Sequence, residues 1–267
     1  MNRALFARTW AAQRLKLLAV ALSLAVWGSL MPVVFKAFRS QISFIIDSGL
    51  IPKELMSFGG GDMLSLAGVV AIGFIHPLAV AMVLVFALGF TVNAVAGERQ
   101  RGTLEVLLAR PISRRRIYGT LLAASVLFIG VAVAAQVVGI VVGSALSGEL
   151  GGLAADRLAL MWLNAVLVFV AIGAVSLLAS VSFDRLSPAL TTSLAIILLW
   201  YFLEILGSLW ADAKGLQPWS LFHYLDPRGA LGGTMSAADW IVPTAILVVA
   251  VAAALVIFPR RDLAAPS

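Results

Sequence analysis

The chain has 267 residues, of which 61% are hydrophobic and only 12% charged, and its mean hydropathy is +1.03. Soluble domains are about a quarter charged, so this composition excludes an ordinary soluble domain and indicates a polytopic membrane protein. The net charge of +6 does not indicate nucleic-acid binding, because the basic residues flank apolar segments. The absence of cysteine excludes disulfides and thiol chemistry.

Six apolar segments are long enough to cross a bilayer, for which a helix needs about 20 residues. They comprise residues 17–35, 64–96, 117–145, 158–181, 189–211 and 240–258. The second segment begins near residue 64 and contains the uncharged run 77–96. The sequence therefore predicts an all-α fold in which residues 1–267 form a single transmembrane domain with six helices.

The N-terminal residues 1–16 combine four basic residues with Leu, Phe and Trp. This mixture favours a helix at the membrane surface, and we expect a cytoplasmic N-terminal segment here. The basic lead and the apolar run 17–35 are both longer than those of a signal peptide. The first apolar segment is therefore predicted to remain as a membrane-spanning helix.

The distribution of Lys and Arg predicts the orientation in the cell (plasma or inner) membrane. With the N-terminus inside, 13 of the 19 basic residues lie on the cytoplasmic side. Short cytoplasmic loops carry such an excess of basic residues. Both termini and residues 97–116 are therefore expected in the cytoplasm, while the long segments 36–63 and 212–239 face outward.

Two ionisable residues lie at or within the predicted spans. Glu204 is the only carboxylate deep in an apolar run, and such a residue is a candidate for substrate recognition or proton movement. The alternative is that Glu204 turns outward or caps the outer segment. His76 precedes Pro77, which can begin a helix, so His76 is expected at the outer interface.

Three amide side chains within the apolar segments complete the candidates for a substrate path. Asn93, Gln136 and Asn164 could line a path, or they could form hydrogen bonds between helices. The small-residue pair Gly139 and Gly143 predicts close packing of two helices. The candidates for the substrate path are His76, Asn93, Gln136, Asn164 and Glu204.

The charged segment 97–116 lies between the second and third apolar segments and contains six arginines. Gly102 can turn the chain, and Thr103 can cap a following helix. The leucines at 104, 107 and 108 share one face of that helix. Pro111 ends it, and Ser113 can cap the next helix. The leucine face suits docking onto another protein, or it could rest against lipid headgroups.

The string Gly-Glu-Arg-Gln-Arg-Gly-Thr-Leu-Glu-Val-Leu-Leu at 97–108, followed by Arg-Pro-Ile-Ser-Arg at 110–114, resembles the signature of ABC-2 type permeases. Those proteins carry this pattern between their second and third spans. The aromatic stretch 221–227 and the basic ending 258–262 resemble that family more weakly. The resemblance is strong over about 20 residues.

The resemblance implies the permease subunit of an ABC exporter for a hydrophobic or amphipathic substrate, such as a drug, antibiotic, peptide or lipid. Two separate cytoplasmic ATPase subunits would use ATP and Mg, while this chain would bind no cofactor or metal and have no enzymatic activity. A second permease, identical or homologous, would complete the pathway in the bilayer. The residues implied in coupling to the ATPase are Glu98, Arg99, Gly102, Thr103, Leu104, Glu105, Leu107, Leu108, Pro111, Ser113 and Arg114.

Two other classes of function remain open from the sequence. An ion-coupled secondary transporter would place carboxylates near the middle of the membrane. A membrane enzyme or a scaffold without transport is the other. The sequence contains no His-Glu-x-x-His zinc motif, no Gly-x-Ser-x-Gly elbow and no Gly-x-x-x-x-Gly-Lys phosphate loop. These familiar forms of catalysis and ATP binding are therefore excluded for this chain.

Overall fold

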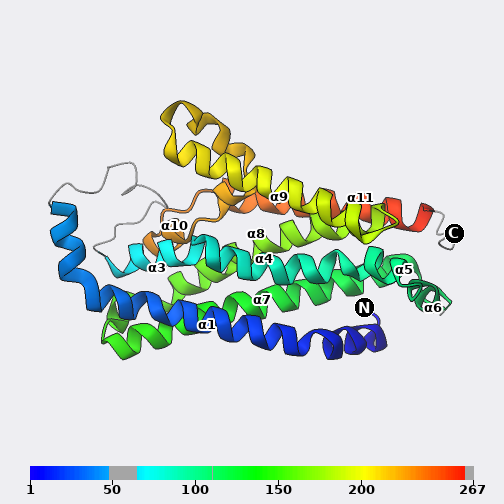
Figure 1. The fold of residues 1–267 in the computed structure, drawn as a ribbon, viewed down its shortest axis with the longest axis horizontal. Helices are drawn as coiled ribbons and strands as arrows, with labels where there is room; N and C mark the ends of the chain where they lie inside the picture. The colour runs from blue at the N-terminus through cyan, green and yellow to red at the C-terminus, as the bar shows by residue number, and fades with distance from the viewer. Residues whose placement is uncertain (48–64, 110, 262–267) are drawn as a thin grey trace.

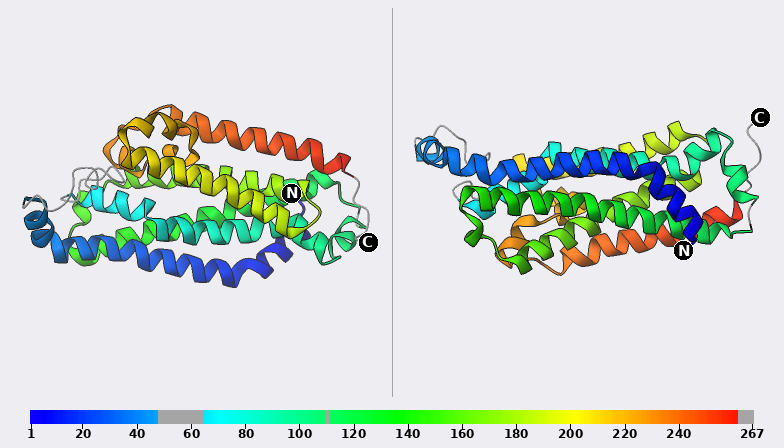
Figure 2. Two further views of the ribbon diagram at one scale, coloured as in Figure 1. Left: turned by 45° about the horizontal axis from the view of Figure 1, so that its top comes forward. Right: turned by 90° about the horizontal axis from the view of Figure 1, so that it is seen from below.

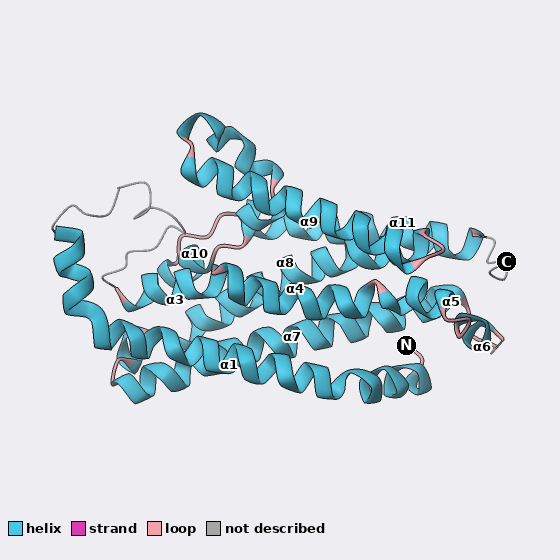
Figure 3. Cartoon of the chain, viewed as in Figure 1, coloured by secondary structure: helices cyan, strands magenta, loops and turns pink. Residues whose placement is uncertain are grey.

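The computed structural model of the chain describes residues 1–47, 65–109 and 111–261. Within these ranges the structure consists of helices and turns and contains no strand (Figure 3). Six of its helices have the length and hydropathy of membrane spans, which confirms the all-α polytopic fold. The spans cover Arg3–Arg39, Pro77–Gln100, Arg114–Ser147, Ala155–Ser182, Leu186–Leu209 and Ala238–Arg260.

The long helices lie side by side along one axis (Figure 1). The N-terminus, the last turn of α11 and α6 lie at one end of this bundle, which we call the basic end (Figure 1). The beginning of α3 and all of α10 lie at the other, which we call the opposite end (Figure 1). In chain order the elements are α1 (Arg3–Asp47), α3 (Leu66–Ile75), α4 (Pro77–Thr91), η2 (Asn93–Gly97), α5 (Glu98–Gln100), α6 (Leu104–Leu108), α7 (Arg114–Ser147), η3 (Leu150–Gly152), α8 (Ala155–Ser182), α9 (Leu186–Leu209), η4 (Ala211–Trp219), η5 (Leu221–Tyr224), α10 (Pro227–Gly232) and α11 (Ala238–Arg260).

Helix α1 is longer than the predicted span 17–35 at both ends. Its 45 residues extend about 67 Å at the rise of an α-helix, whereas the hydrocarbon core is about 30 Å thick. The N-terminal part of α1 packs on α7, because the backbone N–H of Asn2 donates to Thr120 Oγ1 at 2.8 Å and Leu5 is buried. The first residues of the predicted outer segment 36–63 are also helical as far as Asp47, and residues 48–63 lie outside the described residues.

Helices α1 and α7 are in direct backbone contact along their length, and they run together in both views of Figure 2. A Cβ atom added at Gly139 would overlap the backbone of Ala25, and one added at Gly143 would overlap Ser29. Gly28 on α1 meets the carbonyl of Gln136 in the same way. The predicted close packing at the two glycines of α7 is therefore confirmed.

This contact predicts opposite effects for two glycines on the same helix. We expect Gly139→Ala to destabilise the protein by about 1–3 kcal/mol, because the methyl group must push two backbones apart. Gly119 has nothing within 4 Å of a Cβ position, so Gly119→Ala should be neutral or stabilise by about 0.5–1 kcal/mol. Thermal unfolding of the purified variants in detergent measures both. Equal unfolding temperatures for the two variants would contradict the direct contact.

The predicted second span, 64–96, is divided at His76. Helix α3 ends at Ile75, and α4 begins with Pro77 at its first position. A residue before proline is disfavoured in the helical conformation, and His76 adopts an extended ψ of 137°. Its Nδ1 then accepts the backbone N–H of Leu78 at 3.2 Å. The span therefore begins at Pro77, and α3 is a separate short apolar helix.

The remaining spans differ little from their predicted bounds. Ser113 Oγ accepts the backbone N–H of Arg116 at 3.3 Å, which confirms the predicted cap of α7. Helix α8 is the most buried span: 72% of its most apolar 18-residue stretch is buried, compared with 17% for α9. The core of the chain therefore forms around α8. The exposed apolar faces of α9 and α1 are left for lipid or for another chain.

The predicted outer segment 212–239 lies at the opposite end and is built from short helices. It contains η4, η5 and α10, and Asp226 caps α10 through a hydrogen bond from the backbone N–H of Gly229. Asn164 of α8 holds this segment. Its Nδ2 donates to the carbonyls of Tyr224 at 2.9 Å and Asp239 at 3.1 Å, and its Oδ1 accepts the backbone N–H of Asp226 at 3.1 Å.

Candidate functional site

The described part of residues 97–116 forms a compact excursion at the basic end. The π-helix η2 is followed by one turn of α5, a turn at Gly102 with φ of +70°, and α6. The positive φ explains why glycine is needed at this turn. The structure thus confirms a short helix between the second and third spans, at residues 104–108.

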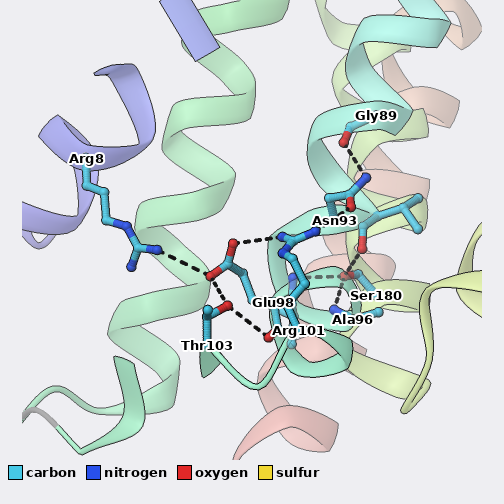
Figure 4. A network of polar contacts seen from close by, with 10 residues as sticks. Arg8, Gly89, Asn93, Ala96, Glu98, Arg101, Thr103 and Ser180 are labelled. Atoms are coloured by element: carbon cyan, nitrogen blue, oxygen red, sulfur yellow. Dashed lines mark hydrogen bonds and ion pairs between the residues drawn. The ribbon is translucent and has the colours of Figure 1, made fainter. Parts of the chain in front are cut away.

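The π-helical turn is stabilised by a buried serine from the neighbouring span. Ser180 Oγ of α8 accepts the backbone N–H groups of Val95 at 3.1 Å and Ala96 at 3.0 Å, and it donates to the carbonyl of Val92 at 2.8 Å (Figure 4). A π-turn leaves backbone groups without their usual partners, and one hydroxyl satisfies three of them. Neither the π-turn nor the role of Ser180 was predicted from the sequence.

Glu98 is the centre of the polar network at the end of the second span. Its Oε2 accepts from Thr103 Oγ1 at 2.7 Å and lies 3.4 Å from Arg8 Nη2, while Oε1 accepts from Arg101 Nη2 at 2.9 Å (Figure 4). The Glu98 carbonyl also accepts the backbone N–H of Thr103 at 3.0 Å. Glu98 therefore connects the N-terminal part of α1 with the turn that precedes α6.

Asn93 extends this network into the span. Its Nδ2 donates to the Gly89 carbonyl at 2.9 Å, and its Oδ1 lies 3.4 Å from Arg101 Nη1 (Figure 4). A Cβ atom at Gly97 would overlap Asn93 Oδ1, so this side chain is packed tightly against the π-turn. The structure places Asn93 beside Arg101 of the charged segment and away from the other candidates for a substrate path.

A second polar cluster joins the segment to the α8–α9 turn. Asp184 Oδ1 forms ion pairs with Arg99 and with Arg261. Beside it, the side chain of Gln100 accepts the backbone N–H of Leu186 at 2.9 Å, at the beginning of α9. The residues that follow the second span are therefore bonded to the connection between the fourth and fifth spans.

The end of α11 is bonded to the same region. Arg114 Nη1, at the beginning of α7, donates to the carbonyls of Phe258 at 3.1 Å and Arg261 at 2.6 Å. Arg261 Nη1 donates to the carbonyl of Val181 at 2.9 Å. Arg99 and Arg114, which the resemblance implies in coupling to the ATPase, thus make these contacts within this chain.

The predicted docking face of the short helix needs a correction. Leu104 is only 2% exposed and belongs to the hydrophobic core of this chain, so it does not form an external surface. The side chains of Leu107 and Leu108 lie outside the described residues. Glu105 and Val106 are exposed, Val106 by 64%, as is Pro111 beyond the helix. The leucine spacing identified one face, but spacing alone does not say which partner covers it.

At the opposite end, Glu204 is bonded to the segment that follows its helix. Its Oε1 accepts from Gln217 Nε2 at 3.0 Å, and its Oε2 lies 3.5 Å from His223 Nδ1. These contacts support the interpretation that Glu204 caps the outer segment. Neither partner was predicted from the sequence, since polar residues are common in this segment and nothing local distinguishes these two.

A cavity of about 920 Å³ opens beside this pair, and both Glu204 and His76 line it. The Glu204 carboxylate raises the pKa of His223 above its usual range, because the negative charge stabilises the protonated imidazole. Burial opposes this change, and Asp239 and Asp226 add to it. His223 is therefore protonated at a higher pH than a free histidine.

The five candidates for a substrate path do not converge on one site. His76 and Glu204 share the cavity at the opposite end, and Asn93 lies at the basic end. Asn164 is fully buried and holds the outer segment. Gln136 is buried at the α1–α7 contact, where its Nε2 makes no hydrogen bond with any described residue.

In the described residues, six apolar spans pack with the fourth one most buried, and a short helical segment follows the second; this arrangement defines a multi-pass membrane protein. The family model for the ABC-2 family transporter protein matches residues 21–263, so the chain belongs to this family of ABC transporter permeases. Membership of this family implies association with ABC ATPase subunits. A search of curated proteins finds no match.

Proposed function

We propose that this chain is the permease subunit of an ABC exporter that moves a hydrophobic or amphipathic substrate across the cell membrane. Two separate ATPase subunits bind ATP and Mg and dock at the basic end, which faces the cytoplasm together with both termini. A second permease, either a copy of this chain or a homologue, completes the pathway. Family membership and the structure of residues 97–116 support this proposal.

The observation that carries the proposal is that this segment is bonded to most of the bundle. Glu98 forms an ion pair with Arg8 of α1, and Arg99 forms an ion pair with Asp184 of the α8–α9 turn. Arg114 reaches the end of α11. A displacement of α6 by an ATPase would therefore move several spans together, as coupling of ATP hydrolysis to transport requires.

The exposed part of α6 is the proposed ATPase contact. Val106 is an exposed apolar residue at the basic end, and Glu105 lies beside it. Leu107 and Leu108 are proposed to join this contact, whereas Leu104 holds α6 to the permease itself. Few residues carry most of the binding energy of an interface, and they are buried at its centre.

The proposal is tested by affinity purification of the chain from its native membrane. We expect an ABC ATPase to co-purify in equal stoichiometry with the wild-type chain. Val106→Asp and Leu107→Asp should insert normally but lose most of the ATPase, because each places an unpaired charge in an apolar contact. The matched control is Ala155→Asp, which adds the same charge to an exposed residue at the opposite end.

Two results would contradict the proposal. One is the absence of any ATPase from the wild-type purification. The other is wild-type ATPase stoichiometry for both Val106→Asp and Leu107→Asp, which would leave α6 without a role in docking. If Ala155→Asp also lost the ATPase, the loss would be a general effect of the added charge. That result would equally contradict the assignment of α6 as the ATPase contact.

A further inference from the structure

The cavity at the opposite end has the size and shape of a ligand site. Its volume of about 920 Å³ lies within the range of pockets that hold small molecules, about 300–1,000 Å³. One wall comes from α3 and the start of α4, and the facing wall comes from the last turns of α9. The chain from η4 to the first turn of α11 forms the remainder.

Part of the lining is apolar and rigid. Ile75 and Val80 lie on the first wall and Ile205 on the second. Phe222 is buried and packs edge-on against Tyr201, with ring centroids 5.6 Å apart. These side chains provide a surface for an apolar body of a ligand.

The acidic and basic residues that line the cavity differ in how deeply they are buried. The acidic residues are partly or fully buried: the side chain of Glu204 is 27% exposed, Asp239 is 8% exposed and Asp226 is half-buried. The basic residues Lys214 and Arg228 are exposed. The buried part of the cavity is therefore negative, and its positive groups lie toward solvent.

One carboxylate oxygen of Glu204 accepts no hydrogen bond from the described residues. Gln217 bonds Oε1, but Oε2 is buried, makes no hydrogen bond with any described residue, and has only the ion-pair contact with His223 at 3.5 Å. Asp226 and Asp239 also accept one backbone hydrogen bond each, from Gly229 and Ser236, but of the three carboxylates only Glu204 has a buried oxygen without a hydrogen bond in the described residues. A ligand cation can therefore pair with Glu204 Oε2 by displacing His223.

We propose that this cavity is a binding site for an amphipathic organic cation, whose charged group pairs with Glu204 and whose apolar body packs against the Ile75, Val80, Ile205 and Phe222 wall. The inference rests on the proposed function, because it names the substrate class of the exporter. In the absence of ligand, His223 occupies the place of the cation.

The proposal makes ligand binding dependent on pH. His223 faces Glu204 of α9, Asp226 before α10 and Asp239 of α11, and protonated His223 competes with the ligand for Glu204. Lys214 of η4, Arg228 of α10 and His76 also line the cavity. The pKa of His223 is raised, so His223 loses its proton only as the pH rises through that raised value. The competition for Glu204 ends over the same interval, and the affinity for the ligand cation increases.

The test uses two ions of the same shape and opposite charge, tetraphenylphosphonium and tetraphenylborate. The purified permease is placed in nanodiscs of zwitterionic lipid without an ATPase, and saturable binding is measured above that of empty nanodiscs. We expect tetraphenylphosphonium to bind more tightly than tetraphenylborate and to gain affinity as the pH rises. Glu204→Gln should weaken cation binding about tenfold, the effect of losing one charge-assisted contact.

The controls separate the site from general charge effects. Asp212→Asn removes a carboxylate from exposed η4 outside the cavity and should leave binding unchanged. His223→Ala should abolish the pH dependence. Equal binding of the two ions by the wild-type protein, or equal affinities for Glu204→Gln and Asp212→Asn, would overturn the proposal. Because no ATPase is present, this result is independent of the co-purification that tests the proposed function.

Discussion

Asn164→Leu is expected to cause the largest loss of stability of any single amide substitution in the described spans. Asn164 is fully buried and satisfies the carbonyls of Tyr224 and Asp239 and the backbone N–H of Asp226. A leucine has a similar volume but leaves these three groups without partners. Each unsatisfied buried group costs about 1–3 kcal/mol. The total is a large fraction of the about 5–15 kcal/mol that holds a folded protein together.

Gln136→Leu is the matched control for this prediction. Gln136 is also a buried amide in a span, but its Nε2 makes no hydrogen bond with a described residue. Its replacement should therefore change stability much less. Thermal unfolding in detergent, followed by size-exclusion fluorescence, compares the two variants. Proteolysis within residues 212–239 should also become faster in Asn164→Leu alone, and similar behaviour of both variants would contradict the structural role of Asn164.

Glu98→Ala is expected to separate ATPase binding from ATPase function. The substitution removes the contacts from Arg8, Arg101 and Thr103. The two exposed ion pairs contribute about 0.2–1 kcal/mol each, and the part-buried hydrogen bond from Thr103 to the carboxylate contributes about 1.5–3 kcal/mol. The exposed surface of α6 is unchanged, so the ATPase should still co-purify. The segment would no longer be held to α1. We therefore expect ATP hydrolysis by the reconstituted complex to fall about tenfold, the effect of losing one such contact.

Glu105→Ala controls for the loss of an acidic residue from the same segment. Glu105 is exposed on α6, and an exposed charge at the edge of an interface contributes little. The complex should hydrolyse ATP at close to the wild-type rate. Two outcomes would contradict the role of Glu98: wild-type hydrolysis by Glu98→Ala, or a loss of ATPase as complete as that expected for Val106→Asp.

The sequence predicted the features that depend on local chemistry. Apolar length identified the spans, Gly102 identified a turn that requires a positive φ, and Ser113 identified the cap of α7. The pair Gly139 and Gly143 indicated a helix contact, because small residues four positions apart let two helix backbones approach closely. Each of these signals acts within one or two turns of a helix.

Features that depend on contacts between distant residues could not be predicted in the same way. The π-turn at 93–97 exists because Ser180, more than 80 residues away, satisfies its backbone groups. Leu104 is buried because other parts of this chain cover it, which periodicity does not reveal. Likewise, only the folded chain brings Gln217 and His223 to Glu204.

The position of the two chain ends has a practical consequence for biochemical work. Asn2 is bonded to Thr120 at the beginning of α7, and Arg261 is bonded to Asp184 beside the segment that follows the second span. An affinity tag or fluorescent protein fused directly before Asn2 or inserted directly after Arg261 would therefore crowd the surface proposed for the ATPase. A long flexible linker avoids this obstruction, and so does an epitope inserted at the exposed Gly151 on the far side of the molecule.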